Sequence, residues 1–413
     1  MHRQSVTALL SGGIGVRVAV IFCCATLIAG CASGKLNRAR NAFYTGDAAD
    51  AVSILDDPES VSRRDRLLFF MEKGLILHES GRYKESAEAL RRAVDFLKAE
   101  EIVSVSRQGT TMVSSERLSI YRGEYQERLL IHTYLMMNYL LLNRFDSAFV
   151  EARQALEIRD EYGKATSGDY FTRALIAHCF EAVGEINGAY IEYKKLAEDM
   201  ADAAPIRPIL YRLARQLGFS DEAAKYKKQM AGKQVSPAAA PKAEALVFVA
   251  QGLGPEKVPQ NIVLPPSIRF SFAAYEPRSL AFFAPDISVS GQSVSSYRVT
   301  TDVAEVLKES LRARAARIIA KETARVTAKE TIARNIEDPI AELLVRVAFF
   351  LTEEPDTRNW ETLPAYLSLV RVPLFAGRQV VTVKTPYGQS KRFEFSVPPN
   401  RRFYYGRVRF GRH

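Results

Sequence analysis

The sequence predicts an α+β multidomain protein, in which a solenoid of helical hairpins precedes a β-rich, sandwich-like domain with a long helical insertion. Three observations predict this fold class. Residues 31–230 show helical periodicity that is interrupted by repeated small-residue turns. Residues 231–244 contain two prolines and no periodicity, which is typical of a linker. Residues 245–413 mostly alternate apolar and polar positions, as strands do, except in a helical stretch at about 302–352.

The first residues are typical of an export signal. Arg3 and Arg17 are the only charged residues before Cys31. An apolar run of about 12 residues, from Val18 to Ala29, follows Arg17. That length suits a signal-peptide core and is short for a membrane span. The run ends in Ile28-Ala29-Gly30-Cys31, which resembles the bacterial lipoprotein processing site. The resemblance implies a signal peptide over 1–30 and lipid, including palmitate, on Cys31; an ordinary secretory signal is the alternative.

The residue after the cysteine indicates which of the two bacterial membranes would hold the lipid anchor. Ala32 stands where an aspartate, in the lipoproteins that this site resembles, marks retention at the inner membrane. The resemblance therefore implies lipid anchoring to the outer membrane, on its periplasmic side, a compartment without nucleic acid. Cys23 and Cys24 leave with the signal, so Cys179 is the only other cysteine of the mature chain. An intramolecular disulfide is therefore excluded.

The clearest helical unit is LLFFMEKGLILHESGRYKESAEALRRAV, residues 67–94. It resembles a tetratricopeptide repeat (TPR) at Gly74, Leu77, Gly81, Tyr83, Leu90 and Ala93, whereas Ser86 stands where alanine is usual. Comparable units centre on turn residues whose spacings are 35, 62, 41 and 34, against about 34 in the consensus. These turn residues are Gly46, Gly81, Asn143, Gly184 and Gly218. We expect TPR-like stacked hairpins over 31–230, with an irregular helical solenoid as the alternative.

Such a stack presents a concave face, built mainly from the first helix of each hairpin. Projecting the repeat onto the sequence gives a candidate partner-binding groove, in which methionines can adapt to irregular apolar partners. The groove residues are Met71, His78, Thr133, Met137, His178, Arg212 and Arg215. They could contact an external partner or the second domain of the same chain, and the sequence leaves both occupants open.

The sequence contains no catalytic or metal-binding motif. Its histidines occur singly, without HExxH spacing, and GxSxG is absent. Gly252 and Gly254 do not form a nucleotide loop, because Pro255 and Lys257 break the GxGxxG pattern. We predict a protein that is not an enzyme and that needs neither cofactor nor metal. The alternative is an envelope glycan-processing enzyme, which would need two facing carboxylates.

A long helix is expected from Asp302 to Asn335, and Thr301 or Asp302 can cap it. Its basic residues recur every four positions, at Arg317, Lys321, Arg325 and Lys329. Antiparallel strands are expected at 365–372, 378–384, 391–397 and 402–410. Residues 371–413 hold ten Lys or Arg and a single acid. We predict a basic surface around Arg402, Arg407 and Arg409 that contacts anionic lipid or glycan; pairing with nearby glutamates is the alternative.

Three segments are distinctive: DTRNWETLPAYLSLVRVPLFAG, YRGEYQERLLIHTYLMMNYL and VFVAQGLGPEKV. With them, the mature chain resembles an uncharacterised family of bacterial outer-membrane lipoproteins with TPR-like repeats. Genes of that family often neighbour lipoprotein activators of penicillin-binding proteins. The resemblance implies a scaffold or adaptor that binds a protein partner in peptidoglycan or envelope assembly. It supplies no catalytic residues, and we expect Asp356, Arg358, Trp360 and Pro364 to be structural.

Overall fold

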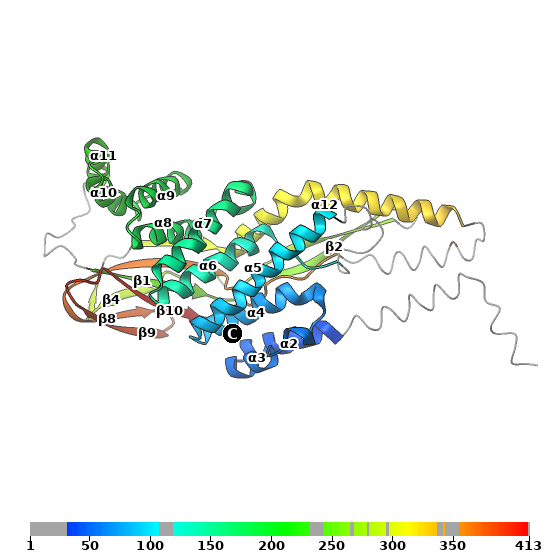
Figure 1. Ribbon diagram of the computed structural model, residues 1–413, viewed down its shortest axis with the longest axis horizontal. Helices are drawn as coiled ribbons and strands as arrows, with labels where there is room; N and C mark the ends of the chain where they lie inside the picture. Colours follow the sequence, from blue (N-terminus) through cyan, green and yellow to red (C-terminus); the bar gives the residue numbers. More distant parts are fainter. Residues whose placement is uncertain are drawn as a thin grey trace, which may run out of the picture.

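The computed structural model describes residues 31–106, 119–230, 243–264, 268–278, 281–294, 297–336, 342 and 355–411. The predicted signal peptide, residues 1–30, lies outside this part of the chain. Figure 1 shows helical hairpins packed beside the β-strands, and one long helix whose far end extends beyond them. The chain therefore combines a helical array with a β-rich part, as the α+β prediction requires.

Residues 31–230, apart from 107–118, fold into five antiparallel helical hairpins. Their helix pairs are α2 (Cys31–Tyr44) with α3 (Ala48–Ile54), α4 (Arg66–Glu79) with α5 (Tyr83–Ser106), α6 (Tyr125–Leu141) with α7 (Phe145–Glu161), α8 (Tyr170–Ala182) with α9 (Ile186–Asp199), and α10 (Arg207–Gln216) with α11 (Ser220–Met230). Each pair turns at a residue with positive φ, a conformation that favours glycine or asparagine. The five turns are the predicted ones, at Gly46, Gly81, Asn143, Gly184 and Gly218. The predicted TPR-like hairpins are confirmed.

The contact between α4 and α5 explains two features of the repeat. A Cβ added to Gly74 would lie 2.5 Å from Cγ and Cδ2 of Leu90, so only glycine lets the two helices approach this closely. The Ser86 hydroxyl donates to the Gly74 carbonyl at 2.6 Å and accepts from Asn138 Nδ2 at 2.8 Å. A hydroxyl replaces the usual alanine here because it links this hairpin to the next one.

The β-rich part contains two four-stranded sheets and a separate hairpin. The inner sheet has the order β10 (Phe403–Phe410), β1 (Ala243–Gln251), β7 (Tyr366–Leu374) and β6 (Tyr297–Asp302). The outer sheet has the order β5 (Gln292–Ser293), β4 (Asp286–Val289), β8 (Gly377–Lys384) and β9 (Ser390–Val397). The hairpin consists of β2 (Glu256–Leu264) and β3 (Ile268–Glu276). β10 pairs with β1 in parallel, so the expectation of a purely antiparallel unit is wrong there; β9 delivers the chain from the outer sheet to the free edge of β1.

The inner sheet is buried on both faces, which gives the molecule three layers. Phe248 and Tyr405 pack with the helices in one hydrophobic core. Val249 and Val408 belong to a second core, between the inner and outer sheets. Because the first core contains side chains from both parts of the chain, the helical array and the inner sheet fold around a common interior.

The long helix α12 (Val303–Arg334) lies between β6 and β7 in the chain. Asp302 caps it, because its Oδ1 accepts a hydrogen bond from Glu305 N at 3.0 Å. Its first turns are buried at Val303 and Leu307, and Figure 1 shows its far end extending beyond the sheets. The side chains of the predicted basic stripe lie outside the described part of the chain, as does most of 337–354. Among the helices of residues 31–336, none is both long and apolar enough to cross a bilayer.

Candidate functional site

The concave face of the helical array is covered by the β-rich part of the same chain. Met71 and His78 on α4, Thr133 and Met137 on α6, and His178 on α8 are each at most 2% exposed. Of the two occupants that the sequence leaves open, the chain itself fills the groove at these five positions.

The segment 355–364, which precedes β7, packs against the first helices of the array without forming a helix or strand, and the chain turns at 361–362. Its backbone is bound by the helices: Trp360 N donates to Glu127 Oε1 at 2.8 Å. The Trp360 ring is 1% exposed and lies 5.5 Å from the Tyr134 ring on α6. Arg358 binds Asp65 at 2.8 Å, which ties the start of the segment to the start of α4. The segment is held in the way that a bound peptide would be held.

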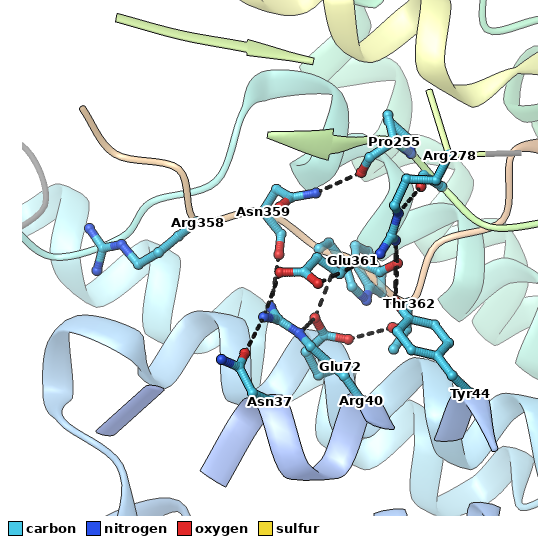
Figure 2. Close-up of polar contacts among 12 residues, drawn as sticks. Asn37, Arg40, Tyr44, Glu72, Pro255, Arg278, Arg358, Asn359, Glu361 and Thr362 are labelled. Atoms are coloured by element: carbon cyan, nitrogen blue, oxygen red, sulfur yellow. Dashed lines mark hydrogen bonds and ion pairs between the residues drawn. The ribbon is translucent and has the colours of Figure 1, made fainter. Parts of the chain in front are cut away.

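An ion cluster around Arg40 joins α2, α4 and this segment (Figure 2). Arg40 Nε lies 2.8 Å from Glu72 Oε1, and its Nη1 lies 2.7 Å from Glu361 Oε1. Its Nη2 donates to the Asn359 carbonyl at 3.0 Å. Burial alone would lower the pKa of Arg40, but Glu72 and Glu361 raise it overall. Arg40 therefore stays charged although it is buried.

The backbone of Glu361 is fixed from the other side of the cluster. Its carbonyl accepts from the Tyr44 hydroxyl at 2.8 Å and from Arg278 Nη2 at 2.7 Å, as Figure 2 shows. Burial raises the pKa of the Glu361 carboxyl, and Arg40 opposes this shift. Glu72 and Glu361 share one guanidinium inside the protein, whereas a glycan-cleaving carboxylate pair must face an open cleft. The arrangement suits the joining of chain segments better than acid–base chemistry.

A second ion cluster corrects the prediction of a basic surface. Arg407 Nη1 lies 2.7 Å from Glu79 Oε2, and Arg409 Nη1 lies 3.9 Å from Glu79 Oε1. The Arg407 and Arg409 side chains are only 14% and 0% exposed, so neither lies on an open surface. The alternation along β10 separates them from Tyr404 and Val408, which pack towards the outer sheet. The other face of β10 meets helices, not solvent, and Arg407 and Arg409 pair there with an acid of the array.

A third cluster surrounds Glu181 on α8, which is fully buried. Its Oε1 lies 2.6 Å from Arg212 Nη2 and 2.6 Å from Arg402 Nη2, and its Oε2 lies 3.1 Å from Arg371 Nη1. Burial raises the pKa of Glu181, but the arginines, above all Arg371, hold it well below its usual range. The cluster brings together Arg212 of the predicted groove and Arg402 of the predicted basic surface.

The two groove histidines belong to the packed interior. His78 Nδ1 lies 2.7 Å from Asn138 Oδ1, and His178 Nε2 lies 2.9 Å from the Tyr405 hydroxyl. Burial lowers the pKa of His78 to about 4 and also lowers the pKa of His178. Both rings are therefore neutral at pH 7. Within the described ranges, no three His, Cys, Asp or Glu side chains gather as metal ligands would.

Sequence reasoning missed Arg40 and Glu72, and it considered Glu361 only as a partner for arginines of the last strands. The pairing of Arg40 with Glu361 spans 321 residues, so no local pattern indicates it. One signal could have found two of the acids: Glu72 and Glu181 each interrupt an apolar stretch of a first helix. Charged residues are rarely fully buried unless they are paired. An acid in such a stretch therefore indicates an unseen cation opposite the helix.

The chain was compared with known proteins. No protein-family model matches it, and no curated protein sequence matches it. Among solved structures, residues 41 to the end of MamA from Desulfovibrio magneticus RS-1 are 10% identical, with a TM-score of 0.31 over 48% of this chain and 93% of that one. YrrB, described as a TPR protein with an unusual peptide-binding site, is 13% identical, with a TM-score of 0.34 over 48% and 84%. RapI in its apo form is 12% identical, with a TM-score of 0.36 over 47% and 51%. These values are too low to support an argument, so the TPR-like character rests on the five hairpins themselves.

Proposed function

We propose that this chain is a lipid-anchored scaffold of the bacterial outer membrane, which faces the periplasm and binds a protein partner in peptidoglycan or envelope assembly. Lipidation of Cys31 rests on the sequence Ile28-Ala29-Gly30-Cys31. The geometry of α2 supports a structural role for that anchor. α2 begins at Cys31, and nine residues later Arg40 binds both Glu72 and Glu361. A lipid on Cys31 would thus be joined directly to the folded body.

The observation that carries the scaffold role is the closure of the groove by the chain itself. Arg40, Glu79 and Glu181 each take part in buried ion pairs that tie the helical array to the β-rich part. Breaking such a pair would leave an uncompensated buried charge, so these pairs hold the two parts together in one folded unit. The acidic side chains of the groove hold the fold together, and the outer helical surfaces are left to bind a partner. We therefore propose a protein that is not an enzyme.

Anchoring is tested by replacing the cysteine in cells. We expect the wild-type protein to incorporate labelled palmitate and to fractionate with outer membrane, whereas Cys31→Ser does neither and remains in the periplasm. Cys179→Ser is the matched control, because Cys179 is buried in α8 and burial raises the pKa of its thiol. Equal palmitate labelling of Cys31→Ser and wild type would contradict the anchor.

Partner binding is tested by photo-cross-linking in the same cells. A benzoylphenylalanine is placed at exposed apolar positions of second helices or turns: Val150 (56% exposed), Ile191 (43%) and Phe219 (42%). We expect a discrete protein adduct from at least one of them. Met71, which is fully buried, serves as the negative control. If none of the three exposed positions gives an adduct, the scaffold proposal is wrong.

A further inference from the structure

The groove reaches solvent at its last hairpin. Of the seven groove residues predicted from the sequence, five are buried within the folded chain, whereas Arg212 and Arg215 on α10 are not. The Arg212 side chain is 33% exposed, and the neighbouring Arg402 side chain, just before β10, is 41% exposed. Arg215 is exposed as well. This end of the array therefore presents cations that belong to both parts of the chain.

The charges at this end do not balance. Arg212, Arg371 and Arg402 surround Glu181, and Arg371 also pairs with Glu244. Three arginines thus share two carboxylates, which leaves one positive charge in excess. Burial, together with repulsion from Arg212 and Arg371, lowers the pKa of Arg402 although Glu181 opposes the shift. Arg212 Nη1 is buried and has no hydrogen-bond acceptor among the described residues.

A shallow pocket of about 280 Å³ lies between α10 and α11, and Tyr211, the residue before Arg212, is part of its lining. It is lined by Tyr211, Arg215, Gly218, Ser220, Ala223, Ala224 and Lys227. Its lining includes one glycine, two alanines, two cations and no acid. The Arg215 guanidinium stands 5.9 Å from the centre of the Tyr211 ring. Neither Arg215 nor Lys227 forms an ion pair with another residue in the described ranges, so both charges are available to a ligand.

We infer that Arg212, Arg215, Lys227 and Arg402 form a docking site for an acidic peptide segment of the partner protein. The inference rests on the proposed scaffold function and deepens it. A glutamate or aspartate of the segment would approach the exposed parts of the Arg212 and Arg402 side chains and offset the excess charge around Glu181. The small residues that line the pocket admit a chain with short side chains, and Arg215 and Lys227 pair with further acids.

Fluorescence anisotropy tests the site with the full chain in detergent micelles. The probe is a fluorescein-labelled peptide of alternating glutamate and alanine, compared with the same peptide carrying glutamine. We expect the acidic peptide to bind at least about tenfold more tightly than its glutamine counterpart. Arg215→Glu combined with Lys227→Glu should weaken its binding about tenfold or more. Ala224→Phe, which fills the pocket without changing any charge, should weaken it as well.

The matched control is Lys391→Glu with Arg392→Glu on β9, which makes the same change of charge at two exposed positions elsewhere. This variant should still bind the acidic peptide. If it loses as much affinity as the Arg215→Glu and Lys227→Glu variant, the binding depends only on net charge and the proposed site is wrong. Unchanged binding by Ala224→Phe would exclude the pocket. Inorganic phosphate is tested as a competitor. If phosphate displaces the probe at a concentration equal to that of the peptide, the site binds simple anions and the proposed peptide site is wrong. Circular dichroism of each variant confirms that it is folded.

The cross-linking experiment separates failure of this site from failure of the scaffold role. Adducts at Val150 or Ile191 that survive Arg215→Glu with Lys227→Glu would show a partner that docks elsewhere. The docking site would then be wrong and the scaffold function would stand. Loss of those adducts in the double variant, but not in the Lys391→Glu and Arg392→Glu control, is the expected result.

Discussion

Arg407 Nη1 lies 2.7 Å from Oε2 of Glu79, so the last strand of the chain is tied to the end of α4. The two side chains are 14% and 2% exposed. Desolvation of two charges is offset only while each keeps its partner in good geometry. The closed groove therefore depends on matched charges as much as on apolar packing.

Replacing Arg407 by methionine should destabilise the protein by about 3 kcal/mol, because it removes the cation that lies 2.7 Å from the buried Glu79 carboxylate. Unfolding of the full chain in urea measures the change. Arg378→Met is the control: Arg378 and its partner Glu394 are 76% and 60% exposed, so their pairing is screened by solvent and its loss should change stability little. Equal losses in the two variants would contradict the role of the buried pair.

Gly74→Ala should destabilise the protein by about 1–3 kcal/mol, since the new methyl group would meet Leu90 at 2.5 Å and force the hairpin apart. Gly34→Ala is the matched control in α2, where an added Cβ has no atom within 4 Å. There the better helix propensity of alanine should raise stability by up to about 1 kcal/mol. Thermal unfolding followed by circular dichroism compares the two, and opposite signs are expected.

The acid sensitivity of the fold should depend on Glu124, which precedes α6. Burial raises the pKa of Glu124, but Lys257 at 2.8 Å and Arg314 lower it to about 2. Because this value lies below the unfolded value of about 4.3, the ion cluster contributes stability above that pH, and the contribution is lost as the pH falls towards 2. Its full size at pH 7 is about 3 kcal/mol.

Glu124→Gln should therefore lower the free energy of unfolding most at pH 7, and the gap to wild type should shrink steadily below about pH 4. Denaturant unfolding at several pH values measures the gap. Glu85→Gln is the control, because Glu85 pairs with Arg82 at the surface and its loss should change stability little at any pH. A gap for Glu124→Gln that is constant from pH 7 to pH 3 would contradict the assignment.

The common core predicts how the two parts behave when separated. The linker at 231–244 suggests two independent domains, whereas 31–230 and 243–411 share one hydrophobic interior. We expect residues 31–230 alone to retain helix but to lack fixed side-chain packing, as seen by far-ultraviolet and near-ultraviolet circular dichroism and by dye binding. Co-expression with residues 243–413 should restore the packed state. A fragment with native-like near-ultraviolet signals would show that the helical array is stable alone.

The local features of the fold could be predicted from the sequence. Asn143 and Gly184 mark turns because a positive φ selects for their residue types. The alternation of Tyr404 and Val408 likewise separated the two faces of the last strand. The alternation does not reveal what covers the opposite face, because the pattern is the same whether that face contacts helices or solvent. The sequence therefore assigns Arg407 to the correct face of the strand. The prediction that this face is exposed to solvent is wrong.

The long-range features could not be predicted in this way. Arg40 and Glu361 are 321 residues apart, and opposite charges are too common in the chain for such a pair to stand out. Nor does the pattern of a strand reveal its neighbours, so the parallel pairing of β10 with β1 was not foreseen. Arg212 and Arg402 were assigned to different surfaces for the same reason. Their common site exists only after the chain has folded.

The parallel pairing of β10 with β1 also bears on how the protein is made. A ribosome completes the helical array long before it reaches Phe403, the first residue of β10. Until then β1 has a free edge, and Glu79 and Glu181 lack Arg407 and Arg402. A chain that ends before β10 would leave the edge of β1 unpaired and would lack the two cations that neutralise these acids. The closed fold is therefore completed only by the final strand.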